Sequence, residues 1–248
     1  MRVALVTGAS RGIGAAIAER FARQGVRVVG VSRAPFDSDL GIESAPADVS
    51  SHGDVKQLVE GVVKRHGRLD VVVNNAAIEH EGTVVDTSAE EWDEVMAVNL
   101  RSVFLCAKYA IPHMRRTRGV IINVASVDGL WAEPSLAAYC AAKGGVIALT
   151  RAIAIDHGHE GIRCMCICPS YVATDMLEQF YDAQPDPAAA RADAAGLHPL
   201  GRISSPAEVA ALAVWLSSDE ASFATGHAYV LDGGLTAGRP IAHQGLAT

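Results

Sequence analysis

Short apolar stretches alternate along the chain with longer segments in which apolar residues recur every three or four positions. Six apolar stretches have the length and β-branched content of strands: VALVT, RVVGV, LDVVVNN, GVIINVAS, IRCMCIC and AYVLD. Their apolar residues follow one another without alternation, which is typical of strands covered on both faces of a parallel sheet. The pattern predicts an α/β fold over residues 1–248: a single doubly wound domain with a parallel sheet of about seven strands and helices on both faces.

The segments between these stretches carry helix signals. Ser88 and Glu91 have the spacing of a capping box, and the run from Ser205 to Glu208 opens another helix in the same way. Residues 34–46 are too short and broken for a full helix. The expected apolar stripes consist of Val55, Leu58, Val59, Val62 and Val63 in residues 51–66, and of Trp92, Val95, Met96, Leu100 and Val103 after the capping box at Ser88.

Composition and charge argue against several classes of function. The chain has 21 Lys and Arg residues against 28 Asp and Glu residues, a net charge of −7, and no basic run of the kind that binds nucleic acid. No signal peptide is recognisable, and no apolar run approaches the length of a membrane span. We therefore expect a cytoplasmic protein that acts on a small molecule and has no nucleic-acid or membrane partner.

Three of the five cysteines, Cys164, Cys166 and Cys168, alternate along one expected strand. Residues two apart in a strand project from one face roughly 6.6 Å apart, which is too far for thiolates that share a zinc ion. An odd number of cysteines in a cytoplasmic protein also argues against disulfides. Buried structural thiols are therefore favoured over a metal site.

Tyr139 and Lys143 lie four residues apart in a helix-forming stretch, so they share one helical face. An ammonium group beside a phenol favours the phenolate, which would make the tyrosine a usable acid and base near neutral pH. The same spacing is also that of an ordinary pair on a helix surface. Its neighbours must decide between the two interpretations.

The first expected strand runs into Thr7-Gly8-Ala9-Ser10-Arg11-Gly12-Ile13-Gly14, and a helix follows. Glycines at such a turn let backbone N–H groups approach a pyrophosphate, and the helix N-terminus adds partial positive charge. The spacing is Gly-x-x-x-Gly-x-Gly and differs from the common Gly-x-Gly-x-x-Gly fingerprint. A plain turn is the alternative, but the position between the first strand and the first helix favours a dinucleotide site.

Seven separated segments together resemble the short-chain dehydrogenase/reductase family, in the family's order and over nearly the whole chain. They are Thr7 to Gly14, Asn74-Asn75-Ala76, Asn99, Ser126, Tyr139 with Lys143, Pro169 to Thr174, and Leu231-Asp232-Gly233-Gly234. The resemblance implies a Rossmann-type domain and transfer of a hydride between NADP(H) or NAD(H) and a secondary alcohol or ketone. It also implies a homotetramer, in which the tail at residues 239–248 reaches a neighbouring subunit.

The resemblance implies four catalytic residues. Tyr139 would exchange a proton with the substrate oxygen, and Lys143 would lower the pKa of Tyr139 and hold the nicotinamide ribose. Ser126 would bind the reacting oxygen, and Asn99 would help to hold a water that relays protons from Lys143. Taken alone, Ser126 is a strand-end cap and Asn99 a packing residue.

The resemblance also places the cofactor. Asp48 would contact the adenine, although alone it is equally a turn or cap before the helix that begins near Ser51. At the end of the second strand, Arg33 together with Arg11 can pair with a 2′-phosphate, which favours NADP(H) and leaves NAD(H) possible because Asp37 and Asp39 follow. The expected cofactor-binding residues are Gly8, Ser10, Arg11, Gly12, Ile13, Gly14, Ser32, Arg33, Asp48, Val49, Asn75, Ala76, Tyr139, Lys143, Pro169, Val172 and Thr174.

Two positions depart from the family pattern. Ala77 stands where the family's Asn-Asn-Ala-Gly has glycine, which requires a negative φ at this residue. Ser170 stands where the family has glycine after proline, and its hydroxyl is free to form a hydrogen bond. Neither change removes a reacting group.

The substrate is the least determined feature. Residues 175–203 are expected to form a mobile lid. Candidate pocket residues are Ser126, Asp128, Trp131, Tyr171 and Met176, with Glu79, His80 and Tyr181. Their mixture of acids and aromatics favours a hydroxylated substrate such as a sugar or cyclic polyol. A 3-oxoacyl carrier protein reductase that uses Arg115, Arg116 and Arg118 is one alternative, and a non-catalytic cofactor-binding sensor is another.

Overall fold

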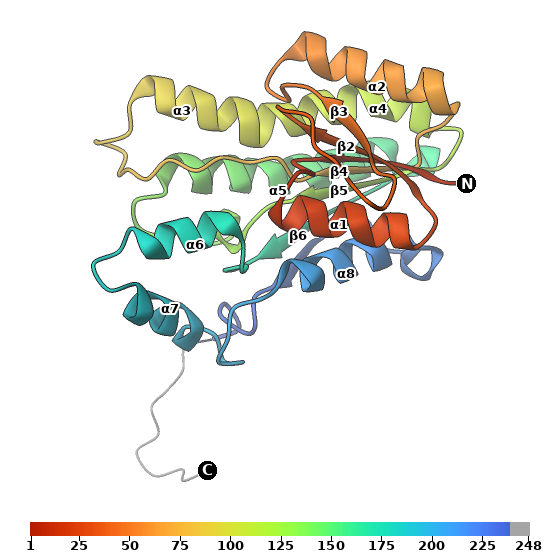
Figure 1. Ribbon diagram of the computed structural model, residues 1–248. Coiled ribbons are helices and arrows are strands. Elements are labelled where there is room, and N and C mark those ends of the chain that lie inside the picture. The colour runs from red at the N-terminus through yellow and green to blue at the C-terminus, as the bar shows by residue number, and fades with distance from the viewer. Residues whose placement is uncertain (239–248) are drawn as a thin grey trace.

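The computed structural model describes residues 1–238, so the expected tail at residues 239–248 lies outside the described residues. Seven strands form one parallel sheet in the order β3-β2-β1-β4-β5-β6-β7 (Figure 1). This arrangement confirms the predicted doubly wound α/β fold. The strands are β1 Val3–Thr7, β2 Arg27–Ser32, β3 Glu43–Pro46, β4 Val71–Asn74, β5 Val120–Val124, β6 Arg163–Pro169 and β7 Ala228–Leu231.

One strand, β3, was not among the six predicted from apolar stretches. It lies within residues 34–46, a segment for which no strand was predicted. It pairs in parallel with β2, with Gly30 opposite Ser44 and Ser32 opposite Pro46. β3 is an edge strand of only four residues, and its terminal proline is compatible with an edge position. Its sequence, ESAP, contains no apolar run because an edge strand is not enclosed by neighbours on both sides.

Helices cover both faces of the sheet (Figure 1). Side chains of α1 and α8 pack on one face, including Ile17 and Phe21, and side chains of α2, α4 and α5 pack on the other, including Val59. The elements are α1 Gly12–Arg23, α2 His52–His66, α3 Ala89–Met96, a π-helical turn Ala97–Arg101, α4 Ser102–Met114, α5 Ala137–His157, α6 Asp175–Asp182, α7 Pro187–Gly196 and α8 Pro206–Ser217, with 3₁₀ turns at Val127–Gly129, Gly158–Glu160 and Asp219–Ala221.

Both predicted capping boxes are formed. Ser88 and Glu91 cap each other's backbone at the start of α3, and Ser205 and Glu208 do so at the start of α8. The expected apolar stripe on α3 is only partly correct. Val95 is buried, whereas Trp92 is 39% exposed.

Two helical stretches have the length and composition of membrane spans, so the expectation that no apolar segment approaches that length is wrong. Ala89–Met114 has 26 residues and Ala137–Glu160 has 24 residues, and the most apolar 18-residue windows within them have mean hydropathies of 1.2 and 1.3. About half of each stretch is buried inside the protein, 50% and 44% of the most apolar window. Both include helices that pack on the sheet, which also explains their apolar character.

Residues 175–203 are more ordered than the expectation of a loop-like lid implies, because they contain α6 and α7. Arg191 of α7 joins the two helices through Glu178 at 2.8 Å and Asp182 at 2.7 Å, both on α6. The pair projects beyond the layered part of the molecule, on the side where the strands end (Figure 1). The three cysteines of β6 are free and buried within the core.

Candidate active site

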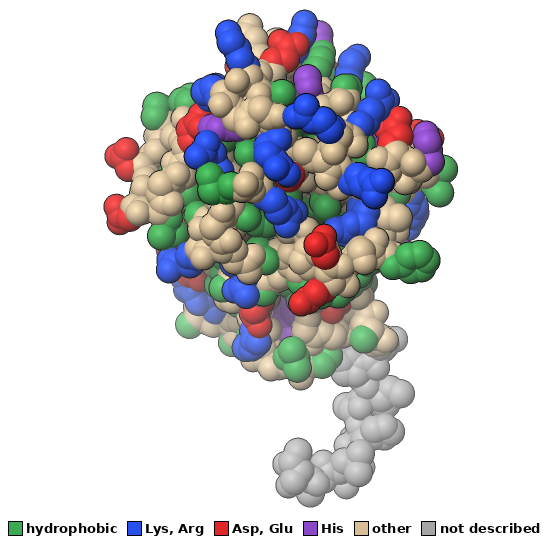
Figure 2. All heavy atoms as spheres, turned by 90° about the vertical axis from the view of Figure 1, so that its right-hand side faces the viewer, with side chains coloured by type: hydrophobic (Ala, Val, Ile, Leu, Met, Phe, Trp, Pro, Cys, Tyr) green, Lys and Arg blue, Asp and Glu red, His purple; other side chains and the backbone are tan. Residues whose placement is uncertain are grey.

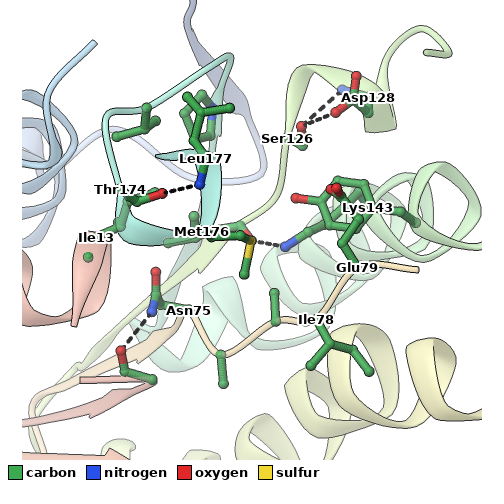
Figure 3. Close-up of a pocket in the computed structure, with 18 of the residues that line it drawn as sticks. Ile13, Asn75, Ile78, Glu79, Ser126, Asp128, Lys143, Thr174, Met176 and Leu177 are labelled. Carbon is green, nitrogen blue, oxygen red and sulfur yellow. Dashed lines mark hydrogen bonds between the residues drawn. The ribbon is translucent and has the colours of Figure 1, made fainter. Parts of the chain in front are cut away.

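One cavity of about 940 Å³ lies along the carboxyl ends of β1, β4, β5 and β6 (Figure 3). Ligands of doubly wound sheets bind at this edge, where the strand order reverses. Here the order reverses between β1 and β4. The loops that follow β1, β2, β4, β5 and β6 all contribute to the cavity wall, so residues distant in sequence meet there.

The glycine loop after β1 is held tightly against the end of β4. The Thr7 hydroxyl accepts hydrogen bonds from the backbone N–H groups of Asn75 at 2.9 Å and Ala76 at 3.1 Å. Gly8 and Gly12 adopt φ values of +67° and +56°, which other residues rarely adopt. A Cβ atom on Gly14 would lie 2.1 Å from the carbonyl oxygen of Gly8, so this glycine allows α1 to start close to the loop.

The glycine loop fits the pyrophosphate of a dinucleotide. Gly8, Ser10, Arg11, Gly12 and Ile13 line the cavity. Arg11 at the N-cap of α1 forms no side-chain capping hydrogen bond, so N–H groups of the first turn are available to an anion. Gly14 does not line the cavity, so its contribution to binding is through packing.

Every other residue expected to bind the cofactor does line the cavity. Besides the glycine loop, these include residues at or after the ends of β2, β3 and β6: Ser32, Arg33, Asp48 and Val49, and Pro169, Val172 and Thr174. Asp48 also forms a turn, because its carboxylate accepts from the N–H of Ser50 at 2.8 Å and from its hydroxyl at 2.7 Å. The structure therefore shows the turn at Asp48, and its contact with the adenine stays a prediction. A nicotinamide dinucleotide has room to extend along these walls.

Tyr139 and Lys143 lie one turn apart on α5 and face the cavity. The ammonium nitrogen of Lys143 is 5.3 Å from the centre of the Tyr139 ring and donates a hydrogen bond to the carbonyl oxygen of Val124 at 2.9 Å. Lys143 is only 3% exposed, and this burial lowers its pKa to about 8, so the side chain stays mostly charged at neutral pH.

The expected effect of Lys143 on the pKa of Tyr139 does not dominate in the protein without its cofactor. Burial raises the pKa of Tyr139 well above its ordinary value, and the carboxylates of Glu79 and Asp128 raise it further. The neighbouring Ser126 hydroxyl acts in the opposite direction but does not reverse the shift. The phenol is therefore protonated near neutral pH.

Ser126 follows β5 and belongs to a tight turn packed on α5. Its hydroxyl donates to the carboxylate of Asp128 at 2.8 Å and accepts from the backbone N–H of Asp128 at 3.1 Å (Figure 3). A Cβ atom on Gly129 would lie 2.7 Å from the carbonyl carbon of Lys143. The glycine thus allows the turn to approach the helix that carries Tyr139 and Lys143.

Asn99 is buried in the π-helical turn between α3 and α4 and does not line the cavity. Its side chain accepts from the N–H of Ile78 at 2.9 Å and donates to the carbonyl oxygen of the same residue at 2.8 Å. These two bonds fix the loop after β4. Wider helical turns of this kind occur often at functional sites.

A wall of carboxylates closes the end of the cavity beyond Tyr139. Glu79 and Glu81 come from the loop after β4, and Glu133 comes from the loop before α5. The two loops meet where the N–H of Gly82 donates to the carbonyl oxygen of Ser135 at 2.7 Å. Partial burial and the neighbouring carboxylates raise the pKa of Glu79 to about 7.

The substrate candidates divide into two groups. Glu79, Asp128, Trp131, Tyr171 and Met176 line the cavity, and the Tyr171 hydroxyl donates to Glu133 at 2.5 Å. His80 and Tyr181 do not line it, which corrects that part of the expectation. The imidazole of His80 lies 3.0 Å from the carboxylate of Glu94, and Tyr181 is the buried residue of α6, with 1% exposure.

Glu81 and Glu133 were not expected from the sequence. Neither belongs to a motif, and they come together only because two loops pair at Gly82 and Ser135. The two family departures are accommodated without backbone strain at either position. Ala77 is not among the described residues with positive φ, and the hydroxyl of Ser170 lies 2.8 Å from Nε2 of His198.

Comparisons with known proteins agree with this geometry. A sequence family described as enoyl-(acyl carrier protein) reductase matches residues 8–236. Meso-2,3-butanediol dehydrogenase of Serratia marcescens is 40% identical over 244 residues, which are 95% of this chain and 95% of that protein. The chain belongs to the short-chain dehydrogenase/reductase family.

Two further relatives show the range of this family. A 3-oxoacyl-[acyl-carrier-protein] reductase of Thermotoga maritima is 37% identical over 245 residues, 94% of this chain and 97% of that protein. The ligand-free structure of an aldohexose dehydrogenase from Thermoplasma acidophilum has a TM-score of 0.94 and 35% identity, and covers 98% of this chain and 97% of that one. The protein is thus an NAD(P)-dependent oxidoreductase that interconverts secondary alcohols and ketones.

Replacement of Gly14 by alanine tests the packing of the glycine loop. Because the added Cβ atom would collide with backbone, Gly14→Ala is expected to lower the free energy of unfolding by about 1–3 kcal/mol and to weaken cofactor binding. Chemical denaturation and cofactor titration measure the two effects. In the matched control Gly53→Ala, the nearest atom lies 4.0 Å away, so stability should hold or rise slightly. Equal behaviour of the two variants would contradict this packing role.

Proposed function

We propose that the protein transfers hydride between NADP(H) and a neutral, polyhydroxylated substrate such as a sugar or cyclic polyol, with Tyr139 as the acid and base. One observation carries this proposal: the Tyr139 phenol, the buried Lys143 ammonium and the Ser126 hydroxyl meet at one point of a cavity whose far wall is acidic. When bound, the nicotinamide cofactor donates or accepts the hydride.

In ketone reduction, the phenol of Tyr139 donates a proton to the carbonyl oxygen of the substrate. The raised pKa keeps the phenol protonated at neutral pH, as this step requires, although it also makes the phenol a weaker acid until the cofactor adds positive charge. In alcohol oxidation the same oxygen must accept a proton. We therefore assign oxidation to the higher pH range, where the phenol loses its proton, and reduction to the lower range.

Lys143 and Ser126 support this proton transfer. The ammonium of Lys143 supplies positive charge beside the phenol and has donors left for the ribose hydroxyls, since only one bond, to Val124, is used within the described residues. Ser126 is assigned to the negative charge that develops on the substrate oxygen. Asn99 is assigned a positioning role through Ile78, and a relay water remains part of the proposal.

The acidic wall favours a neutral substrate over an acidic one. Glu79, Glu81, Asp128 and Glu133 all line the cavity, and like charges would repel an acidic group there. Carboxylates accept hydrogen bonds from hydroxyl groups, so a polyol can satisfy them without adding charge. Sugars and cyclic polyols meet both conditions.

A carrier-protein reductase remains the second candidate, since a relative has that activity. An acidic carrier would have to dock near the cavity, yet Arg115, Arg116 and Arg118 precede β5 and so lie at the opposite end of the strands. Arg115 pairs with Glu160 at 3.0 Å, and Arg116 donates to the carbonyl oxygen of Gly67 at 2.9 Å. Figure 2 shows this end of the molecule, where basic side chains are interspersed with acidic and histidine side chains. This distribution favours the small substrate.

The proposal includes three further features. Residues 175–203 act as a substrate lid, supported by Met176, Leu177 and Phe180 of α6 on the cavity wall. A homotetramer is supported by exposed apolar side chains in two regions. Phe104 lies on α4 and Ile155 on α5, whereas Val230 lies on β7 and Phe223 lies between α8 and β7. A cytoplasmic location is supported by five free thiols.

Tyr139→Phe separates an enzyme from a cofactor-binding sensor. Loss of the phenolic proton should lower kcat on the order of 10²- to 10⁴-fold while leaving NADP(H) affinity nearly unchanged. Steady-state kinetics and cofactor fluorescence titration measure the two quantities. Tyr109→Phe is the control, because Tyr109 contacts His52 away from the cavity. Unchanged turnover in Tyr139→Phe would refute the acid–base assignment, and cofactor binding without turnover of any carbonyl or alcohol by the wild type would favour the sensor.

Arg33→Ala tests the preference for NADP(H). Loss of the guanidinium that is assigned to the 2′-phosphate should weaken NADPH binding about tenfold or more and leave NADH binding within about twofold. Equilibrium titration with both cofactors gives the ratio of dissociation constants. Arg23→Ala removes the same charge from an exposed pair with Glu19 on α1 and should leave the ratio unaltered. An Arg33 variant with an unaltered ratio would favour NAD(H).

A further inference from the structure

The hydroxyl of Ser126 has no free hydrogen while Asp128 is ionised. A serine hydroxyl offers one hydrogen and two acceptor positions. Its hydrogen goes to the Asp128 carboxylate at 2.8 Å, and one acceptor position takes the Asp128 N–H at 3.1 Å. Ser126 can then accept a hydrogen bond from a substrate alcohol, but it has nothing to donate to a carbonyl oxygen or to the charge that develops on it.

Asp128 is poorly placed to release this hydrogen. Its side chain is 9% exposed, and its other carboxylate oxygen, Oδ1, is buried without a hydrogen-bond partner within the described residues. If Ser126 turned toward the substrate, neither carboxylate oxygen would keep a side-chain donor. A buried carboxylate that loses its partners costs more free energy than an exposed one. Asp128 therefore needs a replacement donor whenever Ser126 serves the reaction.

We propose that the substrate supplies this donor itself, through a hydroxyl on the carbon next to the reacting carbon. Two oxygens on adjacent carbons are separated by about the length of a hydrogen bond. One can therefore meet the Ser126 hydroxyl while the other donates to Asp128 Oδ2, which lies 2.8 Å from the serine oxygen. Asp128 is then the residue that determines specificity for vicinal diols and α-hydroxy ketones. The inference rests on the proposed function, because it concerns the same reaction at the same site.

The adjacent hydroxyl should matter in both directions. Reduction and oxidation pass through one transition state, and negative charge on the reacting oxygen needs the Ser126 hydrogen there. A substrate without the second hydroxyl leaves either that charge or Asp128 unpaired. Sites built to bind a substrate hydroxyl discriminate strongly against analogues that lack it.

Matched substrate pairs test this inference. Acetoin and 2-butanone differ by the adjacent hydroxyl in reduction, and D-glucose and 2-deoxy-D-glucose differ by it in oxidation at the first carbon. The ratio of kcat/KM within each pair is measured with NADPH and NADH near pH 8, above the ordinary range of a carboxyl group. The wild type is expected to favour the hydroxylated member at least about tenfold in any pair that it turns over.

Variants of Asp128 test whether this residue causes the preference for the hydroxylated substrate. Asp128→Asn offers an amide N–H to the Ser126 oxygen and so frees the serine hydrogen without help from the substrate. Asp128→Ala removes the acceptor altogether. In both variants the ratio of kcat/KM for the hydroxylated substrate over its partner should fall toward one, whatever the absolute activity of the variant. Glu94→Gln removes a carboxylate that pairs with His80 and does not contact Ser126 in the described structure, and should keep the wild-type ratio.

Three outcomes would overturn the inference: a wild-type ratio of kcat/KM near one, a ratio that survives both Asp128 variants, and an equal fall of the ratio in Glu94→Gln. Replacement of acetoin by 3-amino-2-butanone provides a further arm. A preference for the cationic amine over the hydroxyl would show that the carboxylates select charge, which also contradicts the inference. Turnover of neither pair, with cofactor bound, would instead contradict the proposed function.

Discussion

The buried ammonium of Lys143 is the charge on which the arrangement of the site depends. A cation that is 3% exposed would be costly unless polar groups surrounded it. The carbonyl oxygen of Val124, at the end of β5, accepts one of its hydrogens, and Glu79 and Asp128 lie near enough to oppose the fall in its pKa. The end of a strand, the first turns of α5 and two loops are thereby brought to one point. The same groups form the environment of Tyr139.

This environment has opposing effects on the two side chains. The carboxylates that favour a charged Lys143 disfavour a charged Tyr139, and burial disfavours both charges. Without its cofactor the site therefore keeps the phenol protonated, ready to donate, despite the nearby ammonium. An oxidised nicotinamide ring would add positive charge on the cavity side, where the acidic wall now prevails. In the proposed mechanism, cofactor binding would therefore favour ionisation of the phenol through electrostatics.

The fold and the placement of the proposed catalytic pair were accessible from the sequence because each depends on local patterns. Apolar runs without alternation predicted the parallel strands, and the four-residue spacing of Tyr139 and Lys143 predicted a shared helical face, which α5 provides. The glycine loop was recognisable because steric limits at Gly8, Gly12 and Gly14 leave little choice of residue. β3 was missed because an edge strand of four residues needs no apolar run.

The remaining properties depend on contacts between distant segments, which no local pattern records. Glu81 and Glu133 meet because Gly82 pairs with Ser135. The raised pKa of Tyr139 follows from burial together with Glu79 and Asp128, which come from two different loops. His80 and Tyr181 were assigned to the cavity from residue type alone, whereas the loop and α6 direct them elsewhere. The Ser126–Asp128 bond likewise depends on a tight turn that Gly129 allows against α5.

Direct titration of the Tyr139 phenol tests the central claim most directly. Ultraviolet difference spectra of the wild type against Tyr139→Phe, recorded against pH without cofactor, isolate the phenolate of this one residue. No Tyr139 phenolate signal is expected below about pH 10, the ordinary tyrosine value, because burial and the carboxylates outweigh Lys143. A phenolate signal near neutral pH in the cofactor-free protein would contradict it.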